Sequence, residues 1–215
     1  PDRTANFHLF TQPADGATDA RLELSAPGTQ TPNRLSPDGK QMVVYNLFRD
    51  LGIFTLGQSD HLKSLRASDA QERLGIVSPD GRWLVYESDE SGKQMEVFVR
   101  PFPNVDAGRE KISVDGGRYP LWDPKAEGKR IYYVNLDGGM MSASLRLSPT
   151  LKVESVTKLF DWLKPPVGAS RPYDVSPIDG RFIMPKPIDA GPQGPTHVSV
   201  VLNWVSELSR VLATH

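Results

Sequence analysis

Short apolar segments alternate with clusters of turn-forming residues along nearly the whole chain. Segments such as 42–45 (Met-Val-Val-Tyr) and 131–134 (Ile-Tyr-Tyr-Val) are rich in β-branched and aromatic residues, and Pro, Gly, Asp and Ser stand between them. Such segments favour strands, and the scattered 19 prolines and 18 glycines disfavour long helices. The pattern therefore predicts an all-β chain of many short antiparallel strands joined by turns.

The turns recur as an internal repeat. Ser-Pro-Asp-Gly stands at 36–39 and again at 78–81; a looser copy covers 123–129, and a fourth, with the inserted Ile178, covers 176–181. Pro presets φ, Asp bonds its own backbone, and Gly accepts a positive φ, so each copy is predicted to be the hairpin between two strands. The residues assigned to these turns include Asp38, Gly39, Asp80, Gly81, Asp179 and Gly180.

The spacing of the repeat predicts a β-propeller made of four-stranded antiparallel blades. Ser36 and Ser78 are 42 residues apart, and Ser78 and Asp123 are 45 apart, which matches one blade of about 40–45 residues. Residues 1–215 are expected to form a single propeller domain, or a fragment of one, with about four to five blades. The blades are expected at 7–25 (partial), 33–66, 74–114, 119–160 and 173–204, followed by a short helix at 204–212.

The two ends of the chain break the pattern in complementary ways. The first unit shows only its last two strands, and the last unit, which ends in the strand Val198–Leu202, lacks a fourth. Because bare sheet edges invite aggregation, Arg21–Leu24 is expected to complete the last blade, within one chain or by strand exchange in a homo-oligomer. The alternative is that upstream blades of a larger ring fill the gap.

Composition and charge exclude several classes of function. The 25 Lys and Arg residues nearly balance 26 Asp and Glu residues, without the basic stretch typical of nucleic-acid binders. The absence of Cys excludes disulfide scaffolds, thiol nucleophiles and Cys-type zinc sites. No apolar run reaches the roughly 18–20 residues that span a bilayer. We therefore expect no nucleic-acid partner and no direct membrane insertion, and the start at Pro1 without Met predicts a processed piece of a longer product.

No catalytic, cofactor-binding or metal-binding residue is predicted. Gly168–Arg171 lacks the second glycine of a nucleophile elbow, and the Asp-Gly-Gly turns at 115–117 and 137–139 lack the Lys-Ser/Thr of a phosphate loop. The acidic run 87–90 is interpreted as a solvated hairpin loop. No pair of the four histidines has the spacing of a metal site: His8, His61, His197 and His215.

Three residues are predicted to contact a ligand or partner. Trp162 stands just before a proline-rich loop and is expected to be partly exposed, unlike the strand aromatics, which are expected to fill the layers between blades. Arg171 and Tyr173, which follow the same loop, complete the set.

The repeat resembles that of a known family. Ser-Pro-Asp-Gly-(Lys/Arg) before a strand ending in Tyr is similar to the repeat of TolB-type β-propellers, relatives of the WD-repeat propellers. The run 87–92, residues 97–103 (Val-Phe-Val-Arg-Pro-Phe-Pro) and the closing 201–204 (Val-Leu-Asn-Trp) resemble the C-terminal propeller of bacterial multidomain proteins, such as eukaryotic-like serine/threonine kinases. The resemblance covers 7–212 and implies an extracytoplasmic, periplasmic location as part of a larger protein.

The preferred hypothesis is a non-catalytic propeller module with a sensory or scaffolding role. It would bind a protein partner or a small ligand at a propeller face, without a cofactor and without turnover of its own. The alternative is a propeller-type hydrolase or lyase, or the propeller lid of a peptidase, with a site at the channel mouth. Convergent His, Glu and Arg chemistry at one mouth would favour the alternative.

Overall fold

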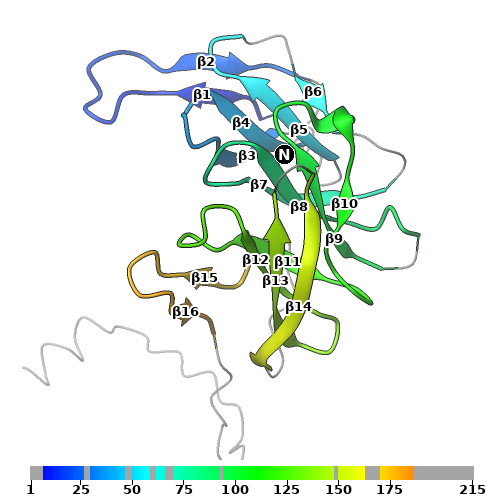
Figure 1. The fold of residues 1–215 in the computed structure, drawn as a ribbon. Helices are drawn as coiled ribbons and strands as arrows, with labels where there is room; N and C mark the ends of the chain where they lie inside the picture. Colours follow the sequence, from blue (N-terminus) through cyan, green and yellow to red (C-terminus); the bar gives the residue numbers. More distant parts are fainter. Residues whose placement is uncertain are drawn as a thin grey trace, which may run out of the picture.

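The computed structural model describes residues 7–26, 30–46, 50–58, 62–65, 70–92, 94–147, 150–162 and 170–185. This part of the chain is built from antiparallel strands and one short 3₁₀ helix, η1 (Val105–Ala107) (Figure 1). Three four-stranded sheets, which we call blades 1 to 3, follow one another along the chain. Blade 1 holds β3 (Gln30–Leu35), β4 (Gln41–Asn46), β5 (Asp50–Thr55) and β6 (Lys63–Ser64). Blade 2 holds β7 (Glu72–Val77), β8 (Trp83–Ser88), β9 (Glu96–Pro101) and β10 (Glu110–Lys111). Blade 3 holds β11 (Arg118–Trp122), β12 (Arg130–Val134), β13 (Gly139–Arg146) and β14 (Lys152–Asp161).

A two-stranded sheet stands at each end of this row of blades. The N-terminal pair is β1 (Leu9–Thr11) with β2 (Arg21–Leu24), and the C-terminal pair is β15 (Asp174–Val175) with β16 (Phe182–Ile183). Within the described ranges, no ladder joins the two pairs. The predicted strand 198–202 and the predicted helix 204–212 lie outside the described residues. The all-β fold with four-stranded antiparallel blades, expected from the repeat, is confirmed.

The apolar core is divided into layers between successive sheets. Side chains of a strand point alternately to its two faces, so Val44 packs with Leu24 of the N-terminal pair, whereas Val43 packs in a layer with Leu84 of blade 2. A third and larger layer joins the other face of blade 2 to blade 3 and to Tyr173 before the C-terminal pair. Face-to-face stacking of sheets around separate apolar layers is what the propeller fold requires.

The predicted turn residues organise the hairpins that enter the second strands. In the turn before β4, Gly39 N–H donates to Ser36 O (2.9 Å), and Asp38 Oδ1 accepts from Lys40 N–H (3.1 Å). The Ser36 hydroxyl also accepts from Gln41 N–H (2.9 Å). The same bonds recur in the turn before β8, and the glycines in the three copies of the repeat that contain Asp-Gly have φ of 71°, 73° and 75° at Gly39, Gly81 and Gly180.

Candidate functional site

The first strands of the blades and β15 are arranged around a common axis and bond to one another through side chains. Asn33 Nδ2 of β3 donates to Gly75 O of β7 (2.9 Å), and Trp122 Nε1 of β11 donates to Ile76 O (2.9 Å). The Tyr173 hydroxyl in turn donates to a main-chain oxygen of β11 (2.8 Å). We call these the inner strands, and a cavity lies at each of their two ends.

The cavity at the carboxyl ends of the inner strands is ringed by the turns of the repeat. It has a volume of about 480 Å³ and is lined by the turn prolines of four successive repeats: Pro37, Pro79, Pro124 and Pro177. Trp122 and Ile76 form part of its wall, and Arg34 and Asp174 are the charged side chains that line it. We call this cavity the proline mouth.

The cavity at the amino ends of the inner strands combines arginines with apolar and hydroxyl groups. It has a volume of about 560 Å³ and is lined by Thr31, Pro32, Asn33, Tyr45, Arg73, Leu74, Ser170 and Arg171. Blade 1, blade 2 and the segment before β15 each contribute, so the cavity exists only once the repeats are stacked. We call it the arginine mouth.

Burial changes the acid–base properties of two groups at the arginine mouth. Burial lowers the pKa of the Arg171 guanidinium, and the neighbouring Arg34 lowers that pKa further. Burial has the opposite effect on the Tyr45 hydroxyl and raises its pKa well above its usual range, because the charged form of tyrosine is the deprotonated one. Tyr45 therefore stays protonated, and its oxygen accepts a hydrogen bond from Leu74 N–H.

Two inner strands are distorted next to the arginine mouth. Leu74 in β7 and Tyr119 in β11 have φ of 56° and 59°, a region that non-glycine residues seldom adopt. Both lie within β-bulges, and both N–H groups are bonded by a side chain of the preceding blade, Tyr45 for Leu74 and Glu87 Oε2 for Tyr119 (2.6 Å). Such strain persists only where the surroundings enforce it, and it concentrates at functional sites.

The acidic run at 87–90 is not the solvated loop that the sequence suggested. Glu87 and Ser88 belong to β8 and are 1% and 0% exposed. Glu87 Oε1 lies 3.0 Å from Arg73 Nη2. Burial raises the pKa of Glu87, while the Tyr119 N–H and the charges of Arg73, Arg118 and Arg171 oppose that rise. The run was misjudged because its partners come from other strands, which a local pattern does not reveal.

The three predicted contact residues lie in different environments. Arg171 lines the arginine mouth and donates through Nε to Pro120 O (3.1 Å). Tyr173 is 5% exposed and packs in the core. The expected exposure of Trp162 is wrong: it is 3% exposed, it packs edge-on against Tyr173 with ring centroids 5.9 Å apart, and its Nε1 donates to Pro185 O (2.9 Å).

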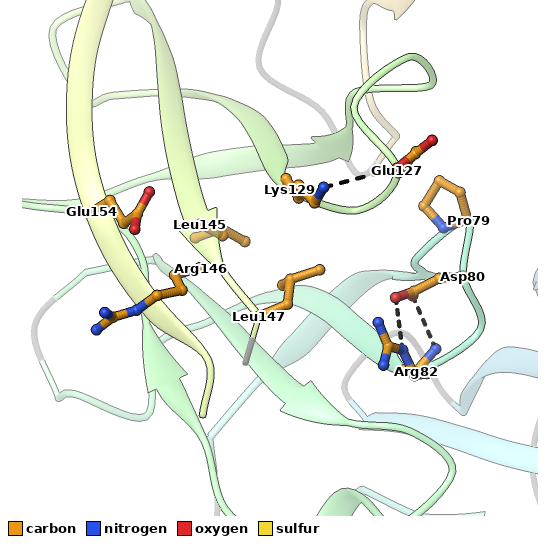
Figure 2. Close-up of a pocket in the computed structure, with 9 residues that line it drawn as sticks. All are labelled: Pro79, Asp80, Arg82, Glu127, Lys129, Leu145, Arg146, Leu147 and Glu154. Carbon is orange, nitrogen blue, oxygen red and sulfur yellow. Dashed lines mark hydrogen bonds and ion pairs between the residues drawn. The ribbon is translucent and has the colours of Figure 1, made fainter. Parts of the chain in front are cut away.

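A further cavity lies between the turns of blades 2 and 3. Figure 2 shows Pro79, Asp80 and Arg82 on one side of it and Leu145, Arg146 and Leu147 on another. Its volume is about 750 Å³. Four of the charged groups here pair within their own turns, Asp80 with Arg82 (2.9 Å) and Glu127 with Lys129 (3.8 Å), so the turn chemistry accounts for those four.

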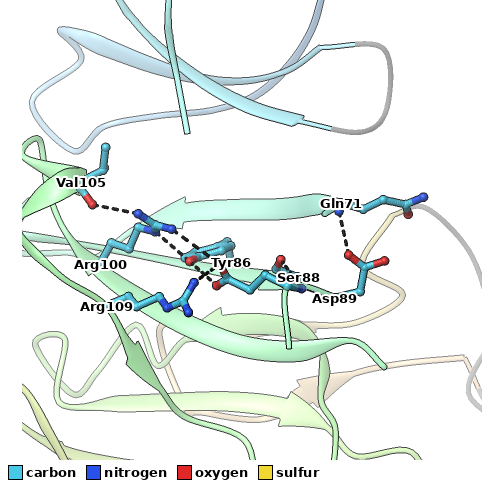
Figure 3. Close-up of polar contacts among 8 residues, drawn as sticks. Gln71, Tyr86, Ser88, Asp89, Arg100, Val105 and Arg109 are labelled. Carbon is cyan, nitrogen blue, oxygen red and sulfur yellow. Dashed lines mark hydrogen bonds and ion pairs between the residues drawn. The ribbon is translucent and has the colours of Figure 1, made fainter. Parts of the chain in front are cut away.

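A polar network on the outer strands of blade 2 satisfies the rest of the acidic run. The Tyr86 hydroxyl donates to Glu90 Oε1 (3.0 Å) and accepts from Arg100 Nε (2.8 Å). Arg100 Nη1 donates to Val105 O (3.1 Å), and Arg109 pairs with Glu90. Figure 3 shows these side chains converging, with Asp89 bonded to Gln71 N–H at the other end of the group.

Among the described residues, no three His, Cys, Asp or Glu side chains are grouped so that they could hold a metal ion. No helix in the described part of the chain is long and apolar enough to cross a membrane.

Comparisons with known proteins show likeness at the level of fold. No protein-family model and no curated protein matches the chain. Among solved structures, it is similar to a candidate 6-phosphogluconolactonase from Bacteroides uniformis (18% identity, TM-score 0.47), covering 79% of this chain and 54% of that one. It is also similar to the tricorn protease (14%, 0.47), covering 66% of this chain and 17% of that one. TolB from Acinetobacter baumannii (19%, 0.46) is matched over 71% of this chain and 39% of that one.

The chain therefore spans about half or less of each of these three proteins. The recognition of a TolB-like propeller is confirmed as a statement about fold, which the stacked four-stranded blades themselves carry. The place of this propeller at the C-terminal end of a multidomain protein, such as a eukaryotic-like serine/threonine kinase, stays a prediction.

Proposed function

We propose that the chain is a non-catalytic propeller module that binds a ligand or the segment of a protein partner at the arginine mouth. The observation that carries the proposal is the convergence of Tyr45, Arg73 and Arg171 from three separate repeats on one cavity. A volume of about 560 Å³ lies within the range of about 300–1,000 Å³ typical of small-molecule sites. Perturbed pKa values at Arg171 and Tyr45 and strain at Leu74 are also typical of functional sites.

The chemistry of the lining favours binding over hydrolysis. The described residues that line the arginine mouth offer guanidinium, amide and hydroxyl groups, and none of them is a carboxylate or an imidazole. A serine such as Ser170 needs a base within hydrogen-bond reach to become a nucleophile. As implied by the sequence resemblance, the module would act outside the cytoplasm as the sensory or scaffolding end of a larger protein.

The proposal is tested by blocking the mouth. Ser170 is exposed at its rim, so Ser170→Trp is expected to fill the cavity without disturbing the core. Small fragments that bind the parent chain, detected by ligand-observed NMR, are expected to lose binding to this variant. Ser91→Trp, in an exposed turn of blade 2, is the matched control and is expected to keep it. Equal binding to both variants would contradict the proposal, and so would turnover that one carboxylate or histidine substitution abolishes.

A further inference from the structure

An arginine occupies the same position relative to the turn in three successive repeats. Arg73, Arg118 and Arg171 each stand five residues before the residue that opens the turn of the repeat: Ser78, Asp123 and Ser176. Thr31 holds this position in the first repeat. Because the inner strands share one axis, the shared position brings the three side chains to the same end of them. Arg73 and Arg171 line the arginine mouth, and Arg73 and Arg118 line the adjoining cavity.

Positive charge at this end exceeds the negative charge that faces it. Glu87 pairs with Arg73, and Arg118 and Arg171 also act on its charge. Three arginines thus act on one carboxylate at this end, Glu87, whereas Arg34 and Asp174 line the proline mouth at the other end. In the adjoining cavity, Asp89 accepts Gln71 N–H and Glu90 is held by Arg109, so both carboxylates already have partners (Figure 3).

Part of the arginines' donor capacity is unused. The Nε groups of Arg73 and Arg118 are buried and have no hydrogen-bond partner among the described residues. The Arg118 guanidinium lies over the Tyr119 ring, 4.8 Å from its centroid, which holds the planar group without using its N–H donors. Buried donors in folded proteins are nearly always bonded, so these two Nε groups are expected to have an acceptor beyond the described residues.

We propose that the arginine mouth is an anion site for the carboxylate of an organic ligand whose remaining part is apolar. This inference rests on the proposed function. The guanidinium fork matches a planar carboxylate, with two parallel N–H···O bonds. Pro32, Leu74 and the ring of Tyr45 supply an apolar wall beside Arg171, and the protonated Tyr45 hydroxyl can add a third donor. A peptide carboxyl terminus, an acidic side chain and a small carboxylic acid share this chemistry.

The test uses matched charged and neutral probes. Binding to the chain is measured by isothermal titration calorimetry with hydrocinnamate and with its neutral amide. Short phenylalanine-ending peptides, with a free or an amidated terminus, and an amidated peptide with an internal aspartate distinguish the sources of the carboxylate. Hydrocinnamate is expected to bind more tightly than its amide, and its affinity is expected to fall with added salt.

Variants assign the effect to the mouth. Arg171→Gln is expected to weaken hydrocinnamate binding about tenfold or more, because a charge-assisted pair is lost. Arg171→Lys keeps the positive charge but lacks the planar guanidinium, and its affinity for hydrocinnamate is expected to lie between those of the parent and Arg171→Gln. Arg146→Gln, in the separate cavity between the turns of blades 2 and 3 (Figure 2), is the control and is expected to bind as the parent does. Circular dichroism checks folding, and Arg73→Gln, at the other arginine that lines the mouth, replaces Arg171→Gln if that variant is unfolded.

Three results would overturn the inference. If hydrocinnamate and its amide bind with equal affinity, and Ser170→Trp abolishes the binding of both, the mouth is a binding site but does not recognise the carboxylate. If inorganic phosphate binds and none of the carboxylate probes does, the site is one for a tetrahedral anion. Absence of binding by all carboxylate probes would remove the anion site, and the fragment experiment would then decide the proposed function separately.

Discussion

Each glycine of the Asp-Gly turns holds a backbone conformation that other residues resist. Gly81 has φ of 73° between β7 and β8, and its N–H donates to Ser78 O (2.9 Å). A Cβ added to Gly81 would meet no atom within 4 Å. The turn therefore demands glycine for its backbone angle and not for lack of space.

This distinction gives a prediction for single substitutions. Gly81→Ala is expected to lower the free energy of unfolding by about 1–2 kcal/mol, because alanine is strained at positive φ. Gly81→Asn is the matched control and is expected to cost less, since asparagine tolerates the left-handed region. Urea denaturation of the three chains measures both effects. Equal losses in the two variants would point to a side-chain clash and contradict the backbone explanation.

Single residues also show where sequence reasoning stops. The turn roles of Asp38 and Gly39 are local, so a four-residue motif is enough to infer them. Trp162 was misjudged because Tyr173, against which it packs, comes from the next repeat. The arginine mouth does have a signal in the sequence, because Arg73 and Arg171, which line it, share one position relative to the turns of their repeats.

At the scale of elements, blade 2 is held by polar bonds as well as by its ladders. Tyr86 of β8 joins Arg100 of β9 to Glu90 of the following turn, beside the apolar layer shared with blade 1. Tyr86 is 0% exposed and its ring stacks on Phe98, with centroids 5.7 Å apart. The network therefore ties the second and third strands of the blade to the turn that connects them.

Removing one hydroxyl tests how much this network contributes. Tyr86→Phe keeps the ring and leaves Glu90 Oε1 and Arg100 Nε without their shared partner. The expected loss is about 1–3 kcal/mol in the free energy of unfolding, the cost of buried polar groups losing a bond. Glu90→Gln and the double variant complete a cycle. If the two groups are coupled, the double variant is expected to lose less free energy of unfolding than the sum of the losses in the two single variants. Strictly additive losses would contradict a joint network.

The strands were the most predictable elements. The first strands before Ser78 and Asp123 follow from apolar runs that end at a turn motif. The bulges at Leu74 and Tyr119 could not be predicted, because they depend on Tyr45 and Glu87 in the preceding blades. Local propensity therefore sets the existence of a strand, and contacts between blades set its distortions.

At the scale of the whole molecule, the described sheets form a curved row with a two-stranded pair at each end (Figure 1). The curvature is evident from both mouths, since each is lined by residues of blade 1 together with residues near the C-terminal pair. Each pair has half the strands of a blade. The expected completion of the last blade by Arg21–Leu24 stays a prediction, because its proposed partner, residues 198–202, lies outside the described residues.

Closure of this row can be tested by disulfide trapping, since the chain has no cysteine of its own. We expect Arg21–Leu24 to pair with Val198–Leu202, because pairing would remove two bare sheet edges. Leu22→Cys, combined with one cysteine at each position from 198 to 202 in turn, is expected to form a disulfide in at least one register. Non-reducing electrophoresis and light scattering then separate a closed monomer from a strand-exchanged dimer. Leu22→Cys with Ser91→Cys is the control. A row that forms no disulfide in any register and stays monomeric would show that closure needs further blades.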